Sequence, residues 1–183
     1  MPRQVFLFER PSRFVAGTVG QPGDRTFYLQ ASDHDGRTVS VALEKSQVQV
    51  LADRMSELLD EVAGRVGAVV PADAEIDDLE PLTPPVDEEF RVAAMGLAWD
   101  GEASAVVVEA VAATDEPIDE DAILSDSDDG PDALRVTITP AEARAFVARA
   151  RRVIAAGRPA CPLCSLPLDP TGHVCPRQNG YRR

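Results

Sequence analysis

Four side chains near the C-terminus have the residue types and the spacing of a metal site. They follow the pattern C-x2-C-x8-H-x-C and comprise Cys161, Cys164, His173 and Cys175. The first two cysteines flank a proline-containing turn that lets both thiolates face one point. One residue separates the histidine from the last cysteine, so both project to the same side of an extended segment. Three thiolates and one imidazole make a closed tetrahedral set that is typical of structural zinc. We therefore predict a zinc cofactor in a small zinc knuckle.

The three cysteines have two other interpretations. They cannot all pair in disulfides, and an odd count argues against a secreted disulfide scaffold. A redox C-x-x-C pair opens a helix in a βαβ unit, whereas Pro162, Pro167 and Pro170 oppose a helix here. Redox chemistry and unligated thiols stay open beside zinc, which the four-ligand spacing favours. Four protein ligands would leave no position for water, so the predicted metal role is structural rather than catalytic.

Length and composition indicate one domain with a core and a small appendage. The chain has 183 residues, of which 44% are hydrophobic. No apolar run approaches the roughly 20 residues that a membrane span needs, and the N-terminal residues lack a secretory signal pattern. We expect a cytoplasmic protein that keeps its thiols reduced and does not contact a membrane.

The charge is divided unevenly along the chain. The formal net charge is −13, yet residues 149–183 hold seven arginines and one acid, which leaves a balance of −19 for residues 1–148. The acidic body disfavours nucleic acid, whereas the basic tail could contact nucleic acid, a phosphate or an acidic partner. The arginines from Arg149 to Arg158 could equally solvate a helix face or cap its C-terminal end.

Periodicity predicts two groups of strands, each followed by a helix. Alternating and β-branched residues predict strands over 4–9, 13–19, 26–32, 37–45, 90–99, 104–111 and 134–138. Apolar residues at helical spacing predict helices over about 46–64 and 140–156. The helices are expected to begin at capping boxes, formed by Ser46 with Gln49 and by Thr139 with Glu142.

This order of elements predicts an α+β fold. It comprises an antiparallel sheet or half-open barrel, built from two β-β-β-α-like repeats with two helices packed on it, plus the C-terminal zinc knuckle. The predicted domains are residues 1–157 and residues 158–183. Residues 73–89 hold eight acids and residues 114–132 hold nine, with no base in either segment. We expect the first segment to be an exposed connection and the second to be a mobile loop.

Several strings in the sequence resemble those of a known family. They are QVFLFERPSRF at 4–14, GTVGQPGDRTFYLQ at 17–30, VALEK at 41–45, and the closing CPLC and CPRQNGYRR segments at 161–164 and 175–183. By these strings, and over essentially the whole length, the chain resembles the DUF3090 family of uncharacterised actinobacterial proteins. The resemblance implies no particular activity.

The leading functional hypothesis is a zinc-binding, non-enzymatic binding or adaptor protein. The chain lacks the nucleophile-elbow, H-E-x-x-H and Walker patterns, so no catalytic residue is predicted. The zinc knuckle and its tail would supply the contact surface for an unknown protein or a phosphorylated ligand. Within the tail, the residues expected to meet a partner's acidic patch or phosphates are Arg177, Tyr181, Arg182 and Arg183.

The alternative hypothesis is an enzyme or ligand-binding protein for a phosphorylated or nucleotide-like small molecule. Guanidinium forks match phosphate oxygens, and the N-terminal hairpin carries Arg10, Arg13 and Arg25. This hypothesis requires those three side chains to converge in a pocket with Arg177 or Arg182. Arginines that are splayed over the surface, or paired with carboxylates, would argue against it.

Overall fold

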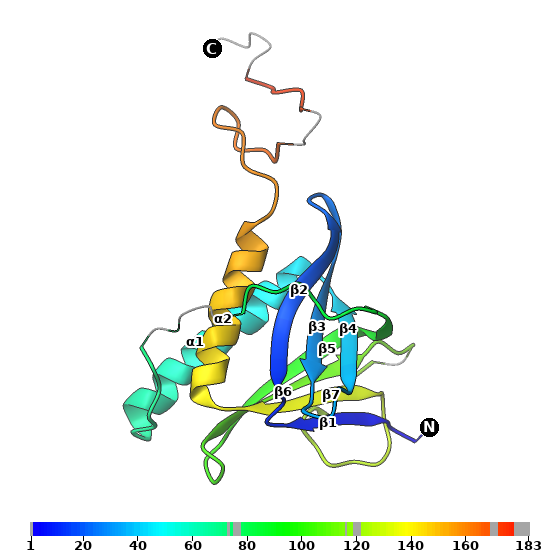
Figure 1. Cartoon of the computed structure of the whole chain (residues 1–183), viewed down its shortest axis with the longest axis vertical. Coiled ribbons are helices and arrows are strands. Elements are labelled where there is room, and N and C mark those ends of the chain that lie inside the picture. Colours follow the sequence, from blue (N-terminus) through cyan, green and yellow to red (C-terminus); the bar gives the residue numbers. More distant parts are fainter. Residues whose placement is uncertain are drawn as a thin grey trace.

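One sheet and two helices form the body of the protein (Figure 1). The computed structural model describes residues 2–72, 74, 78–115, 117–118, 122–168 and 172–177. In chain order the elements are β1 (Val5–Glu9), β2 (Arg13–Gln21), β3 (Asp24–Ser32), β4 (Thr38–Leu43), α1 (Lys45–Arg65), β5 (Glu88–Asp100), β6 (Ala105–Ala112), β7 (Ala133–Ile138) and α2 (Pro140–Ala155). The predicted mixture of strands and helices is therefore confirmed. None of the helices in the described part of the chain is long and apolar enough to cross a membrane.

The sheet is mixed, so the prediction of an antiparallel sheet is wrong. Its seven strands lie in the order β1-β7-β6-β5-β4-β3-β2. Strands β2 to β4 form one antiparallel meander and β5 to β7 form another. Strand β5 pairs with β4 in parallel, because α1 separates the two strands and allows the chain to return to the same end of the sheet. The first strand, β1, pairs in parallel with β7. The internal duplication itself stays a prediction.

The two helices pack against each other and against one face of the sheet (Figure 1). Each helix buries residues that recur every three or four positions, which places them on one stripe. For α1 these include Val48, Leu51, Met55, Leu59 and Val62, and for α2 they include Ala143, Phe146, Val147 and Ala150. Together with inward-facing side chains of the strands they form one hydrophobic core.

The two helix starts differ in how well the sequence predicted them. Helix α2 begins at the expected capping box, in which the Glu142 N–H donates to Thr139 Oγ1 at 3.3 Å. The N-cap of helix α1 is Glu44, two residues before the predicted Ser46, and the Glu44 N–H donates to Gln47 Oε1 at 2.8 Å. Strand β4 ends with the buried Leu43, so the chain turns into the helix at once. The predicted box at Ser46 is therefore wrong.

The segment between α1 and β5 lies against the sheet in its described part. We call residues 78–83 the first strap. The amide of Gln30, which is 1% exposed, donates to Thr83 O at 3.0 Å and accepts from the Thr83 N–H at 2.8 Å. Leu82 fills the space beside Gly17, where a Cβ atom would lie 2.5 Å from Leu82 Cδ2. The first strap is thus bound to β2 and β3 and is not simply an exposed connection.

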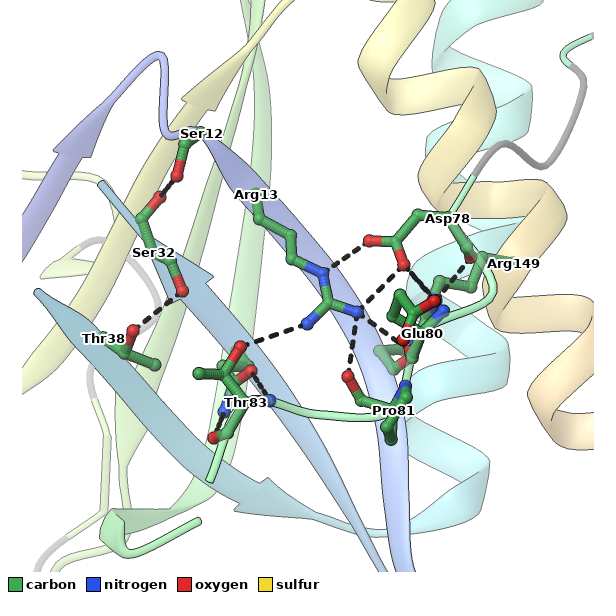
Figure 2. Close-up of polar contacts among 11 residues, drawn as sticks. Ser12, Arg13, Ser32, Thr38, Asp78, Glu80, Pro81, Thr83 and Arg149 are labelled. Atoms are coloured by element: carbon green, nitrogen blue, oxygen red, sulfur yellow. Dashed lines mark hydrogen bonds and ion pairs between the residues drawn. The ribbon is translucent and has the colours of Figure 1, made fainter. Parts of the chain in front are cut away.

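Two arginines bind the first strap to strand β2, an edge of the sheet (Figure 2). Arg13 donates to both carboxylate oxygens of Asp78, at 2.5 and 3.0 Å, and to the carbonyl of Pro81 at 3.0 Å. Arg149 reaches the same carboxylate from α2 at 3.0 Å. It also donates to Ala16 O, a carbonyl on the edge strand, at 3.1 Å. The strap and Arg149 therefore cover a strand edge that would otherwise invite pairing with another chain.

The Asp78 carboxylate makes stability depend on pH. The hydrogen bond from Arg13 lowers the pKa of Asp78, and the charge of Arg149 acts in the same direction. A depressed pKa in the folded state adds stability above the unfolded value of about 3.9, and this stability is lost as pH falls through the folded pKa. We expect Asp78→Asn to be less stable than the wild type at pH 7 in urea unfolding, with the difference shrinking below pH of about 4. The exposed Asp87→Asn variant is the control. A difference that does not change with pH would contradict the assignment.

The second acidic segment is also held by the sheet in its described part. We call residues 122–132 the second strap. The Leu124 N–H donates to Glu109 Oε1 at 3.1 Å. A Cβ atom on Gly96 would clash with Ile123 Cγ2 and lie 3.0 Å from Leu124 Cγ, so the strap packs here because the strand residue is glycine. Arg135 binds Asp126 at 2.7 Å and Ser125 O at 2.5 Å. These contacts differ from the predicted mobile loop, because Asp126 has an arginine partner and the apolar pair Ile123-Leu124 packs on the sheet.

Glu109 is the charged centre of that contact. It is 0% exposed and lies on β6, where all the other residues are valine or alanine. Its carboxylate accepts from Arg3 and, at 2.5 Å, from Arg135. A buried carboxylate is tolerated only when it is paired and hydrogen-bonded, and here two guanidinium groups and one backbone N–H satisfy it. The N-terminal residues are thereby tied to the centre of the sheet.

Candidate metal centre

The first two cysteines lie in a small loop closed by backbone hydrogen bonds. The Leu168 N–H donates to Pro159 O at 2.8 Å, and the Cys161 N–H donates to Leu166 O at 2.7 Å. The Ser165 N–H donates a hydrogen bond to Cys161 O at 2.8 Å, and the backbone of Ser165 is in the left-handed region at φ +61°. This tight turn replaces the helix that a redox C-x-x-C pair would need, and it brings the two thiols to one side.

The four predicted ligands converge. Their ligand atoms all lie within 4.8 Å of one another. The Sγ atoms of Cys161 and Cys175 are 3.9 Å apart, and Cys164 Sγ is 3.3 Å from His173 Nε2. A tetrahedral zinc ion with bonds of about 2.0–2.3 Å separates its ligand atoms by roughly 3.4–3.8 Å. The two closest pairs of ligand atoms are therefore near the separation in a four-coordinate metal site, with Nε2 as the imidazole atom that faces Cys164, and none of the three cysteines is in a disulfide.

The local electrostatics favour a bound thiolate at the first cysteine. Hydrogen bonds from the backbone N–H groups of Cys164 and Leu163 lower the pKa of the Cys161 thiol. Burial raises the pKa of the Cys164 thiol, so a metal cation would be needed to keep both deprotonated. Cys161 and Cys175 are buried, whereas Cys164 and His173 are half-buried. The group is thus largely closed to solvent, as a structural site requires.

The four ligand candidates lie beyond α2, on a segment that extends away from the sheet in Figure 1. Arg158 leads into it and packs over the β2–β3 turn, where a Cβ atom on Gly23 would lie 3.2 Å from Arg158 Nε. Three large aliphatic side chains around the cysteines face solvent: Leu163 and Leu166 are each 49% exposed and Val174 is 81% exposed. The segment therefore presents apolar surface, although its ligand atoms point inward.

The arginines of the alternative hypothesis do not share a pocket in the described part of the chain. Arg13 is paired with Asp78 and lines the groove beside α2, whereas Arg25 lines a separate pocket near the end of that helix. Arg10 lies in the turn after β1 and is exposed. Arg177 is exposed as well. The remaining predicted contact residues, Tyr181, Arg182 and Arg183, lie outside the described residues. The convergence that the alternative required is therefore not found among the described arginines.

Sequence reasoning missed the residues that bind the two straps. A signal for one of them was present, because Glu109 is the single charged residue in the strand Ala105–Ala112. An acid in such a run predicts a buried carboxylate with a basic partner. The roles of Gln30 and Asp78 had no comparable signal, because their partners lie more than fifty residues away in the chain.

These features define a mixed α+β protein with a C-terminal group of three cysteines and a histidine that could hold a metal ion. The chain belongs to the family described as "Protein of unknown function (DUF3090)", whose match covers residues 6–175 and so includes all four ligand candidates. No curated protein and no solved structure matches the chain.

Proposed function

We propose that the protein is a non-enzymatic binding or adaptor protein whose C-terminal contact module is folded around a structural zinc ion. The observation that carries this proposal is the convergence of the ligand atoms of Cys161, Cys164, His173 and Cys175, which lie within 4.8 Å of one another. Soft thiolates with one imidazole favour zinc over magnesium, calcium or manganese, which prefer oxygen ligands. The metal would supply folding energy to a short segment that has little apolar core of its own.

The contact surface is proposed to combine apolar and basic groups. Leu163, Leu166 and Val174 would be held in fixed positions by the metal-bound loop, and residues 149–183 carry a balance of +6. A protein partner with an apolar patch and an acidic rim matches both properties. Arg177, Tyr181, Arg182 and Arg183 would contact that rim. Residues 1–157 would be the scaffold and residues 158–183 the contact module. The protein would be cytoplasmic, where the reducing environment keeps the thiols available to bind zinc.

The scaffold is proposed to have arisen by internal duplication. Strands β2 and β5 each begin an antiparallel meander that is followed by a helix. In each of these two strands a glycine, Gly17 or Gly96, gives room to a leucine from an acidic strap. The alternative function, an enzyme or ligand-binding protein for a phosphorylated or nucleotide-like small molecule, lacks the required convergence of Arg10, Arg13, Arg25 and Arg177 among the described residues.

Site-specific photo-crosslinking tests the adaptor role. A benzophenone amino acid placed at Val174 is expected to form one discrete crosslinked product in extract of the source cells. The product should disappear after zinc chelation or in a Cys161→Ser background, because the metal holds the surface in place. The control position is Val69 on the body, which is 93% exposed and lies far from the cysteines in sequence.

The crosslinked partner should be identified by mass spectrometry and then tested as a purified protein. Its affinity, measured by titration, should fall at least tenfold when Leu163 and Val174 are both replaced by serine. Identical products from positions 69 and 174, or products that persist without metal, would contradict the proposed contact module.

A further inference from the structure

Three cationic side chains from three elements line one small pocket near the C-terminal end of α2. They are Arg25 on β3, Lys45 at the start of α1 and Arg91 on β5, and the pocket has a volume of about 210 Å³. We call it the basic pocket. Its one acidic lining residue, Glu44, pairs with Arg91 at 2.9 Å. The pocket is net positive although the protein has a net charge of −13, so the clustering of these cations needs an explanation.

Two of these cations face the same point. Arg25 Nη2 and Lys45 Nζ each lie 3.5 Å from the position that a Cβ atom on Gly157 would occupy, at the end of α2, and Ile154 O lies at the same distance from it. Arg25 is held there by the ring of Phe27, 4.8 Å from its guanidinium carbon, and by a 3.5 Å hydrogen bond to Ala156 O. Among the residues that the structure describes, neither cation has a carboxylate partner. Two like charges held at one point disfavour each other unless an anion joins them.

The helix ends explain only part of this arrangement. The last carbonyls of α2 attract cations, which accounts for the Arg25 contact. Lys45, however, is the first residue of α1, where the positive end of the helix dipole disfavours a cation. The acid at this helix start is the N-cap Glu44, whose carboxylate is also paired with Arg91. Within the described part of the chain, Arg25 and Lys45 are thus left without a carboxylate of their own, and this pair of cations favours an anion at this position.

We propose that the basic pocket binds a phosphate group, either free or on a small phosphomonoester. The guanidinium fork of Arg25 and the ammonium group of Lys45 would donate charge-assisted hydrogen bonds to its oxygens. Pockets that enclose drug-sized ligands measure about 300–1,000 Å³, so a pocket of about 210 Å³ holds the phosphate group and leaves the rest of the ligand in solvent. This site uses none of the metal ligands and does not rest on the adaptor function.

Calorimetric titration of the full chain with inorganic phosphate and with glycerol phosphate tests the pocket. The wild type is expected to bind with a stoichiometry of about one. An Arg25→Gln/Lys45→Gln variant should bind at least about 100-fold more weakly, because each lost charge-assisted hydrogen bond costs roughly tenfold. The Arg54→Gln/Arg65→Gln variant removes the same charge from exposed positions of α1 and should change affinity by less than about threefold. Tighter binding of glycerol phosphate would identify a phosphomonoester ligand, whereas equal or weaker binding would identify free phosphate.

A second measurement does not depend on the folding of any variant. In the wild type, phosphate should shift the backbone amide NMR resonances of residues 25–27, 44–46 and 91, and few others. Binding that does not saturate, equal losses in the two double variants, or shifts centred elsewhere would overturn the proposal. The Cys161→Ser variant should bind phosphate as the wild type does, so failure of the metal centre and failure of this pocket can be told apart.

Discussion

Replacing Cys161 by serine is expected to abolish metal binding and to unfold residues 159–177 without unfolding the body. Structural zinc contributes an apparent 10–16 kcal/mol or so to the folding of small zinc modules. The loop around the cysteines has few other sources of stability, because Leu163, Leu166 and Val174 face solvent. The buried residues of α2 lie before this segment, between Ala143 and Ala150. The core of the body therefore does not depend on the metal.

Elemental analysis and hydrogen exchange check this expectation. The purified wild type should contain about one zinc ion per chain, and Cys161→Ser and His173→Gln should contain much less. Amide protection should be lost in residues 159–177 only, with the melting temperature of the body unchanged. The other histidine supplies a matched control, because His34 lies in the β3–β4 turn and His34→Gln should keep its zinc. A wild type without bound metal, or a His173→Gln variant with full occupancy, would contradict the metal centre.

Replacing Glu109 by glutamine is expected to destabilise the body by about 3–5 kcal/mol. The substitution keeps the shape of the side chain and removes its charge. Arg3 and Arg135 would then share a buried site with no carboxylate between them. Because small domains are stable by only about 5–15 kcal/mol, this loss is a large part of the total.

Urea unfolding followed by circular dichroism measures the effect. The control is Glu102→Gln in the exposed β5–β6 turn, which should stay within about 0.5 kcal/mol of the wild type. Proteolysis should also cut the second strap faster in Glu109→Gln, since the carboxylate accepts the Leu124 N–H. A Glu109→Gln variant within about 1 kcal/mol of the wild type would show that the two arginines are satisfied without the charge.

The sequence alone determined the features that arise from neighbouring residues. The apolar spacing of α1 and α2 fixed their buried faces, because helical geometry places every third or fourth residue on one side. Thr139 and Glu142 located the start of α2 within a single turn. The four metal ligand candidates were also readable, because they lie within fifteen residues and their spacing alone limits how they can converge.

Only the tertiary structure decided which distant segments meet. Parallel pairing of β1 with β7 joins the two ends of the body, and no local pattern specifies such a pairing. The acidic straps are predicted to be solvated segments because composition cannot show that Asp78 meets Arg13 and Arg149, or that Asp126 meets Arg135. Likewise Arg25 was grouped with Arg13 from their nearness in sequence, yet the fold turns it toward Lys45 and Gly157. Neighbouring residues determine the local geometry of the chain. The tertiary fold determines which charged groups lie within a few ångströms of each other.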